Sequence, residues 1–150
     1  MLPQLHNDPA IPGSLIGSLQ FDAREVVLRI SPDDATMEQC LSSAAQALSV
    51  LRDIDLKAKD AAATHLLPSY NEHWRHYGRS AGDGTIVDVH DTELTASDLK
   101  NRLTMTSIEA LGATCYTVFY DAEKMFHGHS VVVTSFDGLL FSEVSAELFG

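Results

Sequence analysis

The first part of the chain alternates apolar and polar residues in two short runs. Leu15–Phe21 and Val26–Ile30 each place apolar side chains at every second position, and the polar stretch Asp22–Glu25 separates them. A repeat of two residues is typical of a strand with one buried face. The pattern predicts a β-hairpin, preceded by an irregular, proline-containing segment at residues 1–13.

After this hairpin, apolar residues recur at intervals of three and four positions. Ser31, Pro32 and Asp34 would supply an N-cap hydroxyl, a proline at the first helical position and an acid in the first turn. This arrangement predicts a helix that starts at Ser31. Its apolar stripe has the spacing of an amphipathic helix and consists of Met37, Cys40, Leu41, Ala44, Leu48 and Leu51.

Charged residues from Arg52 onward indicate a bend and then a second helix that runs to about Leu67. Pro68 should interrupt the helical pattern, because proline lacks an amide donor and crowds the preceding turn. Tyr70 and Trp74 lie four positions apart and could continue the helix for one or two further turns.

The middle of the chain is less regular. Glycines mark a loop within residues 77–91, and Thr85–Val87 could form a short strand. Thr95 is followed by Asp98 three residues later, which predicts a short third helix that ends near Arg102.

The remaining residues predict a β-meander. Three segments are rich in β-branched and aromatic residues and are separated by turn signals: Thr104–Leu111, Cys115–Tyr120 and Phe126–Ser135, before a last segment at Leu139–Phe149. The element order therefore predicts an α+β fold. We expect a mostly antiparallel sheet, made of the N-terminal hairpin and the C-terminal meander, with two to three helices on one face and one domain over residues 14–150.

The negative charge is concentrated in the second half of the chain. The formal net charge is −11, and from Asp83 onward 11 acids face only Lys100, Arg102 and Lys124. An acidic surface repels phosphate backbones and anionic lipids, so nucleic-acid and membrane binding are not expected. A basic protein partner is compatible with this charge, although acidity could also serve solubility alone.

The start of the chain lacks the basic and apolar regions of a signal peptide. No apolar run reaches the ~20 residues that a membrane-spanning helix needs. We therefore expect a cytoplasmic protein.

Histidines and acids form three clusters, and none of them contains a complete catalytic or metal-binding motif. His127 and His129 would share one face of a strand and could bind one metal ion, or be hydrogen-bonded structural histidines. His73 and His76 would be neighbours on a helix that Trp74 anchors in the core.

The third cluster surrounds His90 and includes Asp88, Asp91 and Glu93. It lacks the glycine and the final glutamate of an EF-hand loop, so a solvated loop or a surface that meets a basic partner is the better interpretation.

The sequence contains no G-x-S-x-G elbow, P-loop or dinucleotide-binding glycine motif. We therefore predict no cofactor, no resident metal and no catalytic residue.

A short stretch near the end of the chain carries a family resemblance: Phe126, Gly128, His129, Ser130 and Val131, with Gly150 behind it. The early hairpin, the two helices after it and the passage from Leu99–Leu103 into Thr104–Ile108 add to this stretch. Together these features resemble a bacterial family known as domain of unknown function 2262. The resemblance covers about residues 14–150. The resemblance implies that family members often have histidine at the position of His129 and an aromatic residue at that of His127. This makes a metal site shared by the two histidines less favoured. The family has no established activity that the resemblance could imply.

Small, acidic domains without catalytic motifs resemble the immunity proteins that are encoded beside secreted bacterial toxins. We therefore expect a non-catalytic protein that covers a basic partner, such as a toxin, with its acidic second half. The candidate binding residues are Asp88, Asp91, Glu93, Asp98, Trp74 and His129. Two alternatives remain: a metal-dependent hydrolase with His129 joined by His73, His90 or Asp91, and a homodimer held by Phe141 and Phe149.

Overall fold

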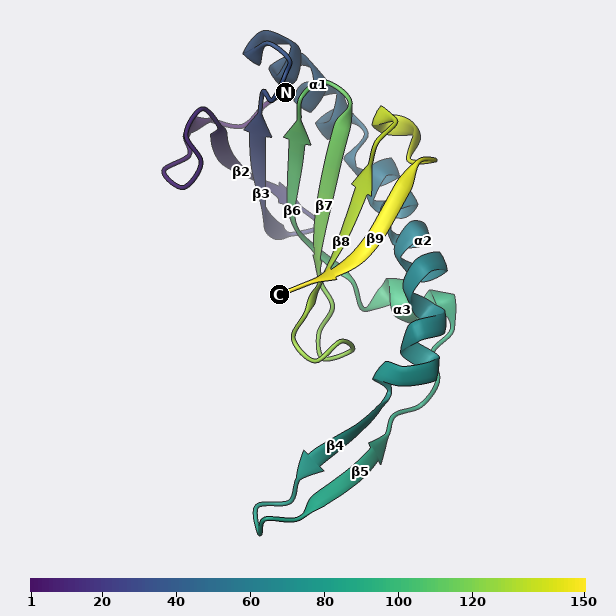
Figure 1. Ribbon diagram of the computed structural model, residues 1–150. Helices are drawn as coiled ribbons and strands as arrows, with labels where there is room; N and C mark the ends of the chain where they lie inside the picture. Colours follow the sequence, from purple (N-terminus) through teal and green to yellow (C-terminus); the bar gives the residue numbers. More distant parts are fainter.

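Seven strands form one sheet in the order β1-β2-β3-β6-β7-β8-β9 in the computed structural model, which describes residues 1–150 (Figure 1). The strands are β1 (His6–Asn7), β2 (Leu15–Phe21), β3 (Arg24–Ser31), β6 (Thr104–Leu111), β7 (Cys115–Asp121), β8 (Ser130–Ser135) and β9 (Val144–Phe149). All neighbouring strands are antiparallel except β3 and β6, which are parallel. The predicted α+β fold with a mostly antiparallel sheet is confirmed.

The helices lie between β3 and β6 in the chain and pack on one face of the sheet (Figure 1). They are α1 (Met37–Ser49), α2 (Leu51–Ser69) and α3 (Ala96–Asn101). None of them is long and apolar enough to cross a membrane. The helix layer follows from the parallel pair, because parallel neighbours need a long crossover connection that a tight turn cannot supply.

The predicted N-terminal hairpin is confirmed as β2 and β3. Asp22 and Ala23 form its turn with φ angles of 50° and 61°. Positive φ at both central residues is the geometry of the turns that match the twist of paired strands. The register pairs Phe21 with Arg24 and Leu15 with Ile30, so the apolar positions of both strands lie on the same face.

The predicted start of the first helix at Ser31 is wrong. Ser31 is the last residue of β3 and pairs with Leu111 of β6. The helix begins five residues later, where Thr36 and Gln39 form a reciprocal capping box. Extension of the parallel ladder prevents Ser31 from acting as a cap, and residues 32–35 form a turn instead.

The predicted interruption at Pro68 is also wrong. Pro68 lies inside α2 near its end, and the chain continues into the π-helix η1 (Tyr70–Trp74), as Tyr70 and Trp74 predict. The Arg75 amide donates to the Tyr70 carbonyl at 3.1 Å, which closes this wide turn. Pro68 removes one amide donor near the helix end, and the helix continues past it.

The C-terminal meander is confirmed, although its third strand is shorter than predicted. This strand, β8, begins at Ser130 and not at Phe126. Residues 123–129 form a turn in which Glu123, His127 and Gly128 have positive φ. The last segment contains the short 3-10 helix η2 (Gly138–Leu140) and then β9.

The N-terminal segment is more ordered than expected. His6 and Asn7 of β1 extend the sheet next to β2, and the buried Asp8 carboxylate pairs with Arg29 at 2.6 Å. Gly17 of β2 permits this approach, because a Cβ atom there would lie only 2.5 Å from the Gln4 carbonyl oxygen.

The core lies between the sheet and the helices. Its largest fully buried side chains are Tyr120, Phe126, Leu28, Ile30, Ile54, Leu99 and Ile108. Two tyrosines of β7 tie the sheet to the helices: the Tyr116 hydroxyl bonds to Ser43 of α1, and the Tyr120 hydroxyl donates to Asp55 of α2 at 2.7 Å. Burial and the Asp55 carboxylate raise the pKa of Tyr120, so this hydroxyl keeps its proton.

Replacement of this hydroxyl should destabilise the protein. In a Tyr120→Phe variant, the buried Asp55 carboxylate loses its phenol donor and keeps only Lys59 at 3.1 Å. We expect the free energy of unfolding in urea to fall by about 1–3 kcal/mol. The control is Tyr77→Phe, since Tyr77 belongs to an exposed hairpin; an equal loss in both variants would contradict the role of Asp55.

Candidate functional site

A β-hairpin, here called the arm, projects from the end of the helix layer (Figure 1). It consists of β4 (His76–Ser80) and β5 (Ile86–His90), which pair only with each other. The short strand predicted at Thr85–Val87 overlaps β5, which begins at Ile86 and is longer than expected. The sequence did not predict β4, since Gly78 and its polar neighbours show no strand pattern. A lone hairpin is marginally stable in water, so the arm depends on what holds its base.

Arg75 and Asn71 hold that base. The Arg75 guanidinium donates to the Asn71 and Asp91 carbonyls at 2.8 and 3.0 Å and reaches the Glu93 carboxylate at 3.5 Å. The Asn71 side chain exchanges two 2.9 Å hydrogen bonds with the backbone of Leu94. The segment that follows β5 is thus tied to the π-helix by hydrogen bonds, at the point where β4 begins.

His76 and His90 face each other across the arm. They are register partners, and their Nδ1 atoms lie 2.7 Å apart. At this distance one neutral ring donates its proton to the lone pair of the other. Desolvation, the Arg75 guanidinium and the His90 ring lower the pKa of His76 below its ordinary value of 6.5.

An aromatic cluster, here called the junction, lies where the arm meets the body. Trp74 is at its centre and makes ring contacts at 5.6 Å with Phe126, 5.7 Å with His127 and 5.7 Å with His129. Tyr77 of the arm lies 4.7 Å from His127, measured between ring centroids. The junction therefore joins the π-helix, the arm and the turn before β8.

The predicted strand geometry of His127 and His129 is wrong, because both residues lie in that turn. His127 has a φ of 54°, and its Nε2 atom lies 3.1 Å from the Trp74 carbonyl oxygen. A left-handed backbone is uncommon outside glycine, and here it directs the His127 ring at Trp74. The predicted helical pairing of His73 and His76 is wrong too, since His73 belongs to η1 and His76 to β4.

A hollow of about 560 Å³ lies at the base of the arm. Its lining combines residues from the π-helix, from just after β5, from just after α3 and from the turn before β8: Tyr70, Asp91, Arg102, Glu123, Lys124 and Met125. Burial and the nearby Asp91 carboxylate raise the pKa of Tyr70. The hollow therefore places a protonated phenol among charges of both signs.

The predicted binding residues divide into three groups. Asp88 is exposed on the arm, while Asp91 and Glu93 lie at its base. Trp74 and His129 contact each other in the junction. Asp98 caps α3 together with Thr95, whose backbone amide is the main cause of the lowered pKa of Asp98.

No group of three or more histidine, cysteine, aspartate or glutamate side chains has a geometry that could hold a metal ion. The hydrolase alternative around His129 therefore has no preassembled ligand set. Both cysteines, Cys40 and Cys115, are free, and burial raises the pKa of each thiol. A raised pKa disfavours the thiolate that nucleophilic catalysis requires.

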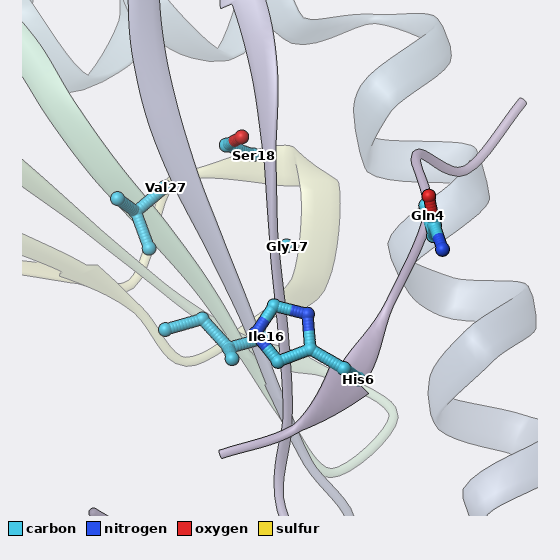
Figure 2. Close-up of a pocket in the computed structure, with 6 residues that line it drawn as sticks. All are labelled: Gln4, His6, Ile16, Gly17, Ser18 and Val27. Carbon is cyan, nitrogen blue, oxygen red and sulfur yellow. The ribbon is translucent and has the colours of Figure 1, made fainter. Parts of the chain in front are cut away.

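A shallow depression of about 390 Å³ lies at the other end of the sheet (Figure 2). Its lining comes from the N-terminal segment, β2 and β3: Gln4, His6, Ile16, Gly17, Ser18 and Val27. His6 is the one titratable side chain in this lining, so the depression offers neither an acid–base pair nor a nucleophile with its base.

Acidification should loosen the arm. Two protonated rings cannot hydrogen-bond through Nδ1, because neither has a free lone pair there. Since the folded pKa of His76 is lowered, the folded arm binds fewer protons than the unfolded one, and its stability falls as the pH drops below 6.5. We expect the arm amides to exchange hydrogen faster at about pH 5.5 than at about pH 7.5, after correction for intrinsic rates.

A His76→Gln variant is the control for this titration. It should lose the pH dependence in the arm amides, while amides of β7 should be unaffected in both proteins. An arm that loosens equally in the variant would assign the effect to another group.

The comparisons with known proteins give one result. The family model described as "Uncharacterized protein conserved in bacteria (DUF2262)" matches residues 14–138. No curated protein and no solved structure gives a significant match. The resemblance seen at Phe126–Val131 is confirmed, and the chain belongs to this uncharacterised bacterial family.

Proposed function

We propose that this protein is a non-catalytic binding domain that uses the acidic arm and the junction to cover a basic protein partner, in the manner of an immunity protein that covers a toxin. The observation that carries the proposal is the arm itself. It is a projecting two-stranded hairpin that presents both strand edges, apolar side chains and unpaired acids.

Exposed apolar side chains on the arm favour a protein partner. Ile86 is 69% exposed and Val87 is 42% exposed. Neither side chain contributes to the core of the domain. A partner that covers them would remove apolar surface from water, and its strand could also pair with a free edge of the arm.

Charge favours a basic partner over a second copy of this chain. Asp83, Asp88 and Asp91 are exposed and form no salt bridge with a basic side chain. A second copy would bring the same acids to the interface, and each copy would carry a net charge of −11. Like charges at close range oppose association, whereas a basic surface would speed the encounter.

The predicted homodimer contact has weaker support. Phe149 is 65% exposed, but Phe141 is only 7% exposed and belongs to the core. The expectation that Phe141 lies at the surface is therefore wrong. Phe149 also contacts Phe119 of the same sheet, with ring centroids 6.2 Å apart.

Capture experiments with matched charge variants test the proposal. Tagged protein is incubated with cytosol of its own bacterium, captured proteins are identified by mass spectrometry, and the affinity for the main basic one is measured. We expect an Asp83→Asn and Asp88→Asn double variant to bind about tenfold more weakly, because two charges facing the partner are lost. Added salt should weaken wild-type binding.

The control double variant is Asp33→Asn and Asp34→Asn. It removes the same charge from the turn between β3 and α1, at the opposite end of the helix layer from the arm. Binding that falls equally in both variants, or that is unchanged by salt, would contradict a contact through the arm.

A further inference from the structure

The hollow at the base of the arm has the properties of a ligand site. It has a volume of about 560 Å³, and its six lining residues come from four separate segments of the chain. We propose that this hollow binds a small zwitterion, with a free α-amino acid as the simplest ligand of this class. The ligand's carboxylate is bound by Arg102 and Lys124, its ammonium by Asp91 and Glu123, and Tyr70 donates a hydrogen bond.

The Tyr70 side chain is the first reason. Tyr70 is only 2% exposed, yet its hydroxyl makes no hydrogen bond to another protein group. No buried polar side-chain atom of the protein is both sealed from solvent and unpaired. The hydroxyl must therefore reach the hollow that Tyr70 lines. The hydroxyl of a buried phenol ring normally has a hydrogen-bond partner, and a ligand in the hollow is in the position to be one.

Unpaired cations are the second reason. The chain has 21 acidic and 10 basic side chains, so most basic groups find an acid nearby. Only Arg24, Arg79, Arg102 and Lys124 form no salt bridge. Two of these four line the hollow. Such a pair of free cations beside a phenol is a suitable binding site for a carboxylate.

The acids of the lining decide between a zwitterion and a simple anion. Asp91 and Glu123 line the same hollow and form no salt bridge. They would repel phosphate or a dicarboxylate, whereas an ammonium group would satisfy them. Asp91 and Arg102 act in opposite directions on the pKa of Tyr70, so both charges lie near its hydroxyl. A ligand with adjacent positive and negative groups matches this arrangement.

Calorimetric titration of the full-length protein with each proteinogenic L-amino acid tests the site. We expect at least one to bind with a dissociation constant below about 1 mM. Tyr70→Phe keeps the ring in the core and removes only the hydroxyl, and Arg102→Gln alters an exposed side chain. Each should weaken binding about tenfold, because one hydrogen bond or one charge contact is lost.

Arg79→Gln is the matched control, since it removes an unpaired arginine from the arm and leaves the hollow intact; its affinity should equal that of the wild type. The N-acetylated and the amidated forms of the ligand should both bind more weakly than the free amino acid. Absence of binding by every amino acid would overturn the proposal. So would equal binding of inorganic phosphate, or full affinity in both hollow variants.

The tests of this site and of the partner proposed above are independent, although Asp91 belongs to both surfaces. The partner experiment alters Asp83 and Asp88, which do not line the hollow, and the hollow variants leave those acids in place. Either proposal can therefore fail while the other holds.

Discussion

The parallel pairing of β3 with β6 is the constraint on which the rest of the structure depends. Antiparallel strands can follow one another through short turns, as β2 and β3 do, but parallel neighbours need a connection that returns to the starting end of the sheet. Residues 32–103 make this return and contain all three α-helices, the π-helix and the arm. The helix layer and most of the candidate site thus exist because two strands run in the same direction.

The long crossover also explains why the arm leaves the body. The chain descends along α2, passes through the wide turn of η1 and comes back at α3 (Figure 1). Asn71 and Arg75 hold the base of the arm, because their side chains bond to the backbone of Leu94 and Asp91 where the chain returns to the domain. The hollow forms next to this closure, where Tyr70, Asp91 and Lys124 approach from different parts of the chain. The proposed partner-binding surface and the hollow therefore lie next to each other, where the crossover leaves and rejoins the domain.

Local signals made much of the fold predictable. Alternation in Leu15–Phe21 and the three-four spacing around Ala44 identified strand and helix correctly, and Thr95 with Asp98 identified the third helix. The errors arose where a distant partner decided the outcome. Ser31 has the properties of a cap, but the ladder with Leu111 extends through it. The candidate site is non-local in the same way, since nothing near Asp91 in the sequence indicates that Tyr70 lies beside it.

The position of Trp74 has a practical consequence. It is the one tryptophan of the chain, and its indole is half-buried between Phe126 and two histidine rings at the root of the arm. When the protein is excited at wavelengths that tyrosine does not absorb, its ultraviolet emission therefore comes from a single known place, without any added dye. Its wavelength and intensity report directly on how much water reaches the junction between the arm and the domain.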